Sequence, residues 1–347
     1  MKRKLIAILI LCVVLCTSIF GLTACSNNDS KPIIEISADG YWVINGEKTE
    51  YKANIDDSSS QSTSTEQLAF ILNSDKQSYS VRGLGTYSDF DVVIPSEHNG
   101  LPVTGIATFA FVDCDYIQTI TIPNSITSIG VYAFFNCRSL TSIMIGDNVS
   151  SIGEGAFHGC SSLTSIEIPD SVTSIGDNAF YGCNSLEYNI KDGLKYLGND
   201  NNKYLYLRYT ISTEIIIAII DSDCKFIDGA TFSDCSSLTS VTIPNNVTYI
   251  GNSAFSGCHS LTNIIIPNSL TYIGPAAFYG CSSLTSIIIP NSVTYIGFDA
   301  FENCNSLEYI YCKAESQPSG WHKDWNVKNN YMNDFIYHNV IWGYKGQ

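Results

Sequence analysis

The amino-acid sequence predicts a β-rich α/β solenoid, in which short coils of chain stack on one another, and two regularities support this prediction. A phenylalanine recurs every 23 residues in two runs: Phe111, Phe134, Phe157 and Phe180, then Phe232, Phe255, Phe278 and Phe301. A cysteine stands three residues after each of them: Cys114, Cys137, Cys160, Cys183, Cys235, Cys258, Cys281 and Cys304. A fixed period in the twenties is the signature of a solenoid, because each coil buries its apolar face only against its neighbours.

Each regular coil divides into segments whose residues indicate their structure, as the coil that starts at Leu163 illustrates. Apolar residues alternate up to Ile168, which is the pattern of a half-buried strand. Pro169 ends this strand, at a position where the sheet needs no backbone N–H donor. A second short strand is expected over residues 173–175. The following Ala179 and Phe180 are expected to lie in one helical turn.

The repeats are expected to fill residues 107–312, between two terminal caps. Residues 68–106 form the N-terminal cap and an irregular first coil, in which five extra residues follow Pro95. Residues 313–347 lose the period and are expected to fold over the last coil as an aromatic C-terminal cap, with Trp321, Trp325, Phe335 and 340–342. Terminal coils are atypical because one of their faces does not stack.

The period is interrupted by an irregular insertion at residues 187–223. Cys235 follows Cys183 by 52 residues, which is two periods and six further residues. We expect a degenerate coil with a protruding hairpin, formed by residues 194–197 and 204–209. A buried strand is then expected over residues 215–220.

The N-terminus predicts export. Three basic residues at positions 2–4 precede an apolar run over residues 5–20, which has the length and flanks of a signal peptide. The tetrad Leu22-Thr-Ala-Cys25 resembles the lipobox of bacterial lipoproteins, which implies cleavage after residue 24, lipidation of Cys25 and a cell-membrane anchor at the cell surface. The alternative is an ordinary secretory peptide cut near Ala24.

Three short segments are expected between the lipid anchor and the solenoid. Residues 25–31 form a polar tether. Residues 32–55 alternate around turns at Asp39-Gly40 and Asn45-Gly46, which predicts a small β-hairpin module. Residues 56–67 are rich in Ser and Thr and predict a flexible linker.

Composition and charge exclude several classes of partner. The apolar fraction of 45% supports a continuous core, and a charged fraction of 15% is too low for a generally disordered chain. The formal net charge is −15, and removing residues 1–24, which hold three basic residues and no acid, brings it to −18. Such a chain is not attracted by charge to nucleic acid or to anionic lipid headgroups, so the lipid anchor is its expected membrane contact.

Taken together, the strand pattern, the Pro, the Gly and the Phe-x-x-Cys turn resemble the leucine-rich repeat of the BspA family over residues 92–312. Members of this family are bacterial surface proteins that adhere to host matrix and to other cells. The resemblance therefore implies a right-handed leucine-rich-repeat solenoid that binds host matrix or microbial surface proteins, with glycans as possible ligands, and that is not an enzyme.

No motif in the sequence indicates catalysis, a cofactor or a metal. The cysteine ladder has three interpretations: small buried apolar residues, selected disulfides, or a metal ladder, and no Cys-x-x-Cys or His pairing supports the last. The five histidines share no motif. Asp200, Asp221 and Asp223 could hold a cation weakly, but solvated loop acids are the expectation.

Two outward columns change character after the insertion and give the candidate binding face. In the second strand, Ser128, Ser151 and Ser174 are replaced by Phe226, Tyr249, Tyr272 and Tyr295; in the first strand, Thr121, Met144 and Glu167 are replaced by Thr242, Ile265, Ile288 and Tyr311. Aromatic columns can stack on sugar rings or anchor a protein partner. They can equally serve only to stabilise the ladder through cross-strand pairing.

The expected function is therefore that of a lipid-anchored, adhesin-like binding protein. Two alternatives remain: a carbohydrate-binding accessory lipoprotein, and a structural spacer without a ligand of its own. The solenoid alone does not decide among them, because a fold does not establish a function.

Overall fold

The computed structural model describes residues 67–331 and 334–346, and the backbone of three short strands between residues 34 and 52. The expected signal peptide, Cys25, the tether and most of the linker lie outside the described residues. The three strands β1 (Ile34–Ile36), β2 (Tyr41–Ile44) and β3 (Glu47–Lys52) pair antiparallel, in the region where a hairpin module was expected.

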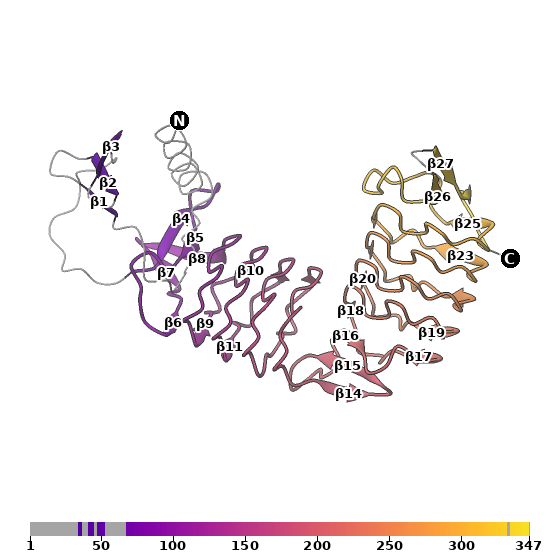
Figure 1. Ribbon diagram of the computed structural model, residues 1–347, viewed down its shortest axis with the longest axis horizontal. Coiled ribbons are helices and arrows are strands. Elements are labelled where there is room, and N and C mark those ends of the chain that lie inside the picture. Colours follow the sequence, from indigo (N-terminus) through magenta and orange to yellow (C-terminus); the bar gives the residue numbers. More distant parts are fainter. Residues whose placement is uncertain (1–33, 37–40, 45–46, 53–66, 332–333, 347) are drawn as a thin grey trace.

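The coils form an arch of two halves, each with an inner and an outer sheet (Figure 1). The inner sheet of the first half holds β4 (Ala69–Leu72), β5 (Tyr79–Gly83), β8 (Leu101–Ile106), β10 (Ser128–Ile129), β12 (Ser151–Ile152) and β13 (Ser174–Ile175), with β7 (Glu97–His98) beside β8. The outer sheet of this half holds β6 (Asp91–Val93), β9 (Thr119–Thr121) and β11 (Ser142–Met144). Each regular coil therefore gives one strand to each sheet.

The second half repeats this plan. Its inner sheet holds β14 (Asn189–Lys191), β15 (Leu194–Leu197), β16 (Tyr206–Thr210), β18 (Phe226–Ile227), β20 (Tyr249–Ile250), β22 (Tyr272–Ile273) and β24 (Tyr295–Ile296). Its outer sheet holds β17 (Ile217–Ile219), β19 (Ser240–Thr242), β21 (Asn263–Ile264), β23 (Ser286–Ile289), β25 (Tyr309–Cys312) and β28 (Asn339–Ile341). The regular coils pair in parallel at equivalent positions, as Tyr249 pairs with Tyr272 and Tyr272 with Tyr295. The solenoid with repeats of about 23 residues is confirmed, and it makes about ten turns.

The periodic Phe and Cys residues form the centre of the core. The eight phenylalanines are buried, and consecutive rings stack nearly parallel with centroids 5.0 to 5.5 Å apart. The cysteines are free and buried, and the thiol of one coil donates to the Phe carbonyl of the coil before it, as Cys137 Sγ does to Phe111 O at 3.0 Å. The interpretation of the cysteines as small buried residues is confirmed for the described residues, and the thiol also supplies a hydrogen-bond donor.

The expected helical turn at the Phe position is wrong, because the described residues contain no helix. Alternate N–H groups of this stretch bond to the next coil: Phe134 N donates to Ala156 O at 2.7 Å, whereas Phe135 N donates within the turn to Tyr132 O at 3.2 Å. Residues with positive φ on either side, such as Asn178 at 56° and Asn303 at 61°, prevent helical continuation. The turn is thus a third ladder between coils rather than a helix.

The insertion is part of the inner sheet rather than a protruding hairpin. Strands β14, β15 and β16 form an antiparallel meander that joins β18, and Leu194, Tyr196 and Tyr206 in it are buried. The buried strand expected over residues 215–220 is half-buried: Ala218 and Ile220 face the core, while Ile217 faces solvent. The period of two places successive side chains on opposite faces, so a strand at the surface of the solenoid cannot bury every isoleucine.

Both caps are present in the described residues. At the N-terminal end, β4 and β5 pair antiparallel, as expected, and β5 leads into the inner sheet through β8. At the C-terminal end, Trp321 and Trp325 are buried, and Trp325 meets the last core ring, Phe301, edge to face at 6.0 Å. The strand β28 extends the outer sheet by pairing with β25, and the hairpin of β26 (Val327–Tyr331) and β27 (Asp334–Tyr337) precedes it.

Candidate functional site

The two halves of the arch meet at a junction where coils far apart in sequence touch directly. The turn after β13 reaches the turn after β20, because Asn252 N donates to the Asp177 carboxylate at 3.0 Å. In the same way Asn178 N donates to the Asp228 carboxylate at 3.2 Å. In the regular coils these turns bond through backbone carbonyls, as Gly155 N does to Asp177 O. Two aspartate side chains therefore continue the ladder across the irregular coil.

The position of Asp228 explains why the junction can form. In regular coils this position is glycine, and a Cβ at Gly176 would lie 2.3 Å from Glu154 N of the preceding coil. The irregular coil that precedes Asp228 lacks the regular turn. This leaves room for a side chain at position 228, and the Asp228 side chain occupies that room. Sequence reasoning missed it, although the aspartate in the glycine column and Thr231 in the alanine column were visible signals.

A buried ion pair holds the junction from the side of the irregular coil. Arg208 Nη1 lies 2.8 Å from the Asp228 carboxylate, and both side chains are nearly inaccessible to solvent. The guanidinium also lies over the rings of Tyr209 at 5.1 Å and Tyr181 at 5.8 Å. Burial raises the pKa of Asp228, and the positive charge of Arg208 opposes that effect. Removing either partner would leave a buried charge uncompensated.

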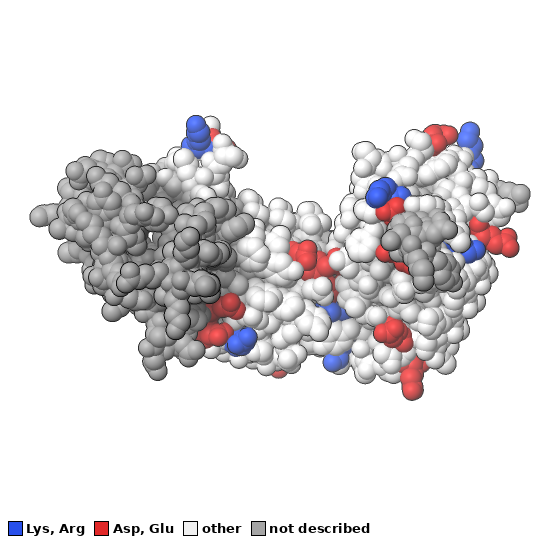
Figure 2. Space-filling model, turned by 45° about the horizontal axis from the view of Figure 1, so that its top comes forward, with Lys and Arg blue, Asp and Glu red and all other residues white. Residues whose placement is uncertain are grey.

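Asp177 differs because no cation pairs with it. Burial, with the negative charges of Asp228 and Glu154, raises the pKa of Asp177 to about 6, and the hydrogen bond from Asn252 N opposes this effect. The junction thus holds three carboxylates close together and one arginine. Figure 2 shows acidic side chains gathered at the waist between the two halves, on a face that carries few other charges there.

A groove lies along this waist, on the inner side of the arch. We call it the junction groove; its volume is about 590 Å³. One wall comes from the turn after β13 and from Glu154, and the other from the inner sheet of the second half. The lining residues are Glu154, Thr173, Ser174, Ile175, Gly176, Asp177, Phe226, Thr248, Tyr249, Asn252, Thr271, Tyr272, Pro275, Thr294 and Tyr295.

The tyrosine column of the candidate binding face lies in this groove. The rings of Tyr249, Tyr272 and Tyr295 are stacked, with successive centroids 4.5 Å apart and planes within 9° of parallel. Because neighbouring rings cover each other's faces, the column presents ring edges and hydroxyls to the groove. Burial, with the negative charge of Asp177 nearby, raises the pKa of the Tyr249 and Tyr272 hydroxyls. Phe226 at the end of the column is buried.

The other candidate residues lie on the opposite side of the solenoid. Ile265, Ile288 and Tyr311 belong to the outer sheet, where Ile265 is 74% exposed and Ile288 41%. The same outward column continues to Ile219, 58% exposed, at one end and Ile341, 38% exposed, at the other. The predicted face is therefore two surfaces: the junction groove, and an outer column that we define by Ile219, Thr242, Ile265, Ile288, Tyr311 and Ile341.

The outer column borders a second hollow, of about 450 Å³, lined by residues of β21 and β23 together with Lys313. The column beside it on the same sheet is mostly polar, with Ser240, Asn263 and Ser286. The exposed part of these isoleucine side chains adds nothing to the stability of the fold, because it stays in water. Ile265 and Ile288 are neighbours in this column, and exposed apolar side chains that lie side by side are typical of interaction surfaces.

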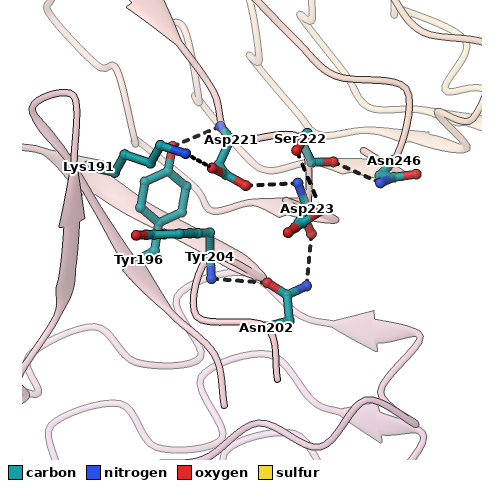
Figure 3. A network of polar contacts seen from close by, with 8 residues as sticks. All are labelled: Lys191, Tyr196, Asn202, Tyr204, Asp221, Ser222, Asp223 and Asn246. Atoms are coloured by element: carbon teal, nitrogen blue, oxygen red, sulfur yellow. Dashed lines mark hydrogen bonds and ion pairs between the residues drawn. The ribbon is translucent and has the colours of Figure 1, made fainter. Parts of the chain in front are cut away.

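The acids of the insertion are engaged within the chain. Figure 3 shows Lys191 against the Asp221 carboxylate, and Asp221 N donates to the Tyr196 hydroxyl at 3.2 Å. Asp221 Oδ1 accepts from Asp223 N at 2.9 Å, and Asn202 Nδ2 donates to Asp223 O at 3.0 Å. Asp221 and Asp223 therefore fasten the insertion to the next coil, and Asp221 has its own cation in Lys191.

Over the described residues, no group of three or more His, Cys, Asp or Glu side chains is arranged to hold a metal ion. His158 and His259 lie in different coils and do not meet. Within that same part of the chain, none of the segments forms a helix that is long and apolar enough to cross a membrane.

Comparison with known proteins identifies the repeat. The family model described as the BspA type leucine rich repeat region matches residues 92–208 and 209–318, with six copies of the repeat. A search of curated proteins gave no match.

Several solved structures are similar to the chain. A leucine-rich repeat protein from Bacteroides ovatus is 30% identical, over 73% of this chain and 71% of that one, with a TM-score of 0.36. The leucine rich repeat protein of T. pallidum is 25% identical, over 71% and 91%, with a TM-score of 0.35. A leucine rich cell surface protein from Faecalibacterium prausnitzii is 24% identical, over 86% and 98%, with a TM-score of 0.32. With the family model matching well over half of its length, the chain belongs to the family of BspA-type leucine-rich-repeat proteins.

Proposed function

We propose that this protein is a lipid-anchored, non-enzymatic binding protein of the bacterial cell surface, which recognises a protein partner of the host or of another microbe through its repeats. The observation that carries the proposal is the outer column, whose isoleucines remain exposed at successive coils of a rigid sheet. Side chains held at coil spacing form a preorganised apolar row, and preorganisation lowers the entropic cost of binding.

The family and the sequence motifs support the location and the non-enzymatic role. One similar structure carries the description of a cell surface protein. The signal-peptide pattern and Cys25 supply the attachment, and the Ser/Thr-rich linker separates the anchor from the solenoid. The family match supports binding rather than catalysis, and no acid–base or nucleophile motif occurs in the sequence.

The test compares binding of the mature segment, residues 26–347, to panels of matrix and microbial surface proteins. An Ile265→Ser/Ile288→Ser variant is expected to lose at least tenfold in affinity, since two well-packed apolar contacts contribute about 1 to 2 kcal/mol each. A Val93→Ser/Met144→Ser variant, altered at exposed positions of the outer sheet in the first half, is the matched control. Equal binding by all three proteins would refute the outer column as the site.

A second candidate function, carbohydrate binding by an accessory lipoprotein, is favoured by one feature: the hydroxyl-rich lining of the junction groove. Glycan binding that is lost in Tyr272→Ser/Tyr295→Ser, with the outer column intact, would favour this function. If neither the protein panels nor a glycan panel yields a ligand, the alternative of a structural spacer without its own ligand would be favoured.

Cys25 is tested separately from the repeats. Metabolic labelling with a fatty acid is expected to mark the full-length protein and not its Cys25→Ala variant, which should be released from the membrane fraction. Labelling of both proteins, or retention of the variant, would contradict the lipid anchor.

A further inference from the structure

The junction groove has a lining that is rich in hydrogen-bond acceptors and poor in positive charge. Two carboxylates border it, those of Glu154 and Asp177, and none of its lining residues is lysine or arginine. The nearest buried cation is Arg208, whose guanidinium is held by Asp228 at 2.8 Å. The charge of Arg208 is therefore balanced inside the junction, and the groove itself keeps a negative potential.

The two carboxylates have different environments. Asp177 is 4% exposed and forms the floor, where it accepts a hydrogen bond from Asn252 N at 3.0 Å. Glu154 is exposed at the rim, and its Oε1 accepts a bond from the Tyr132 hydroxyl at 3.0 Å. A floor of fixed charge below an accessible carboxylate favours a ligand that brings positive charge and several donors.

The hydroxyl column adds acceptors on the opposite wall. Tyr249, Tyr272 and Tyr295 all line the groove, and a phenol oxygen can accept a hydrogen bond from a ligand. The stacked rings leave no face free for a sugar between them, since successive centroids are 4.5 Å apart. A small group with N–H donors fits this wall better than a flat ring does.

We propose that the junction groove binds an alkylammonium or guanidinium group, placed between the Glu154 carboxylate and the tyrosine hydroxyls above the Asp177 floor. Such a group can come from a lysine or arginine side chain of a protein or from an amino sugar. This site is independent of the outer column, so the two can be tested apart.

The test uses the mature segment and four small probes in calorimetric titrations at low salt. Two are cationic, Nα-acetyl-lysine amide and glucosamine; two are their uncharged counterparts, Nα-acetyl-norleucine amide and N-acetylglucosamine. We expect at least one cationic probe to bind and its uncharged counterpart to show no heat. A preference for the lysine probe identifies a protein side chain as the source, and a preference for glucosamine identifies an amino sugar.

Two glutamate variants with the same change in net charge locate the site. Glu154→Gln is expected to weaken binding of the cationic probe at least fivefold, whereas Glu167→Gln, which lies in the outer hollow near Asp170 and Asn199, should leave it unchanged. Ile265→Ser/Ile288→Ser should also leave it unchanged, which separates this site from the proposed protein-binding surface. Equal weakening by both glutamate variants would show general charge attraction, and no binding by either cationic probe would overturn the site.

Discussion

The imidazole Nε2 of His338 lies 3.0 Å from the carbonyl oxygen of Phe301, the last phenylalanine of the periodic core. In interior coils the equivalent carbonyl accepts the thiol of the next coil, as Phe278 O accepts from Cys304 at 3.0 Å. No further coil follows Phe301, and His338 takes the place of the missing cysteine. The C-terminal cap therefore ends both the aromatic stack and the thiol ladder.

His338→Ala is expected to destabilise the last coils by about 1 to 3 kcal/mol, because it leaves a buried carbonyl without a donor. Nδ1 lies 3.0 Å from Leu307 O, so the neutral ring donates to one of the two carbonyls and only the protonated ring donates to both. Hydrogen exchange of residues 301–312 should report the loss. His338→Asn, which keeps an amide donor, is the conservative control and should lose less; equal protection in all three proteins would contradict the capping role.

The pH dependence of His338 follows from its burial, which lowers its pKa below the ordinary value despite the two carbonyl contacts. The folded state then binds fewer protons than the unfolded state below about pH 6.5. The contribution of His338 to stability is complete above that pH and is lost as pH falls. His338→Asn should reduce this acid-side loss, measured by urea unfolding between pH 5 and 8.

Asp177→Asn is expected to change the pH dependence in the opposite sense. The pKa of Asp177 is raised to about 6, so the folded state binds more protons than the unfolded state between about pH 4 and 6, and stability falls as pH rises through this window. The shift corresponds to about 2 to 3 kcal/mol. Asp177→Asn should flatten this slope, whereas the exposed Asp147→Asn should keep it; an unchanged slope in Asp177→Asn would contradict the assignment.

Arg208→Met is expected to cost about 3 to 5 kcal/mol at the junction, because Asp228 would remain buried and charged without its partner. The double variant Arg208→Met/Asp228→Asn should recover part of this loss, since no charge is then left uncompensated. Urea unfolding, with limited proteolysis of residues 208–230 as the local readout, measures both. A double variant less stable than Arg208→Met would contradict the ion-pair argument.

The ladder thiols are expected to resist modification in the folded protein. The ten cysteines of the described residues are all free and buried, and burial raises the pKa of Cys224 and of Cys312 to about 12 each. Because the thiolate is the reactive form, a disulfide reagent should titrate almost none of them before denaturation and all ten afterwards. Rapid reaction in native buffer would show that the coils open.

Much of the fold follows from the period alone. The Phe and Cys marks predict the stack and the buried thiols because every coil repeats one environment, and the alternation of apolar residues predicts both sheets. The turn at Phe134 was misjudged because its bonds run to Ala156 of the next coil, and a single coil does not show where its donors go. Asn and Asp at positive φ, as at Asn136, were the local signal.

The candidate site was less predictable than the fold. The sequence predicts that the side chains of Tyr249 and Ile265 point outward. It does not show that they lie on opposite sides of the solenoid. The junction depends on contacts across 75 residues, from Asp177 to Asn252, which connect turns on either side of the irregular coil. The sequence does not show that these two turns meet. Only the departures from the repeat, above all Asp228 in the glycine column, indicate where the junction lies.

The thiol ladder also bears on how the number of repeats can vary. The ten described cysteines are free, and six of them donate to the Phe carbonyl of the preceding coil, so the described solenoid holds its coils together without disulfides. Its coils can be copied or deleted without disturbing a pairing scheme, because no coil depends on a covalent partner in another. Repeat number can therefore vary in evolution while the chemistry of the core stays the same.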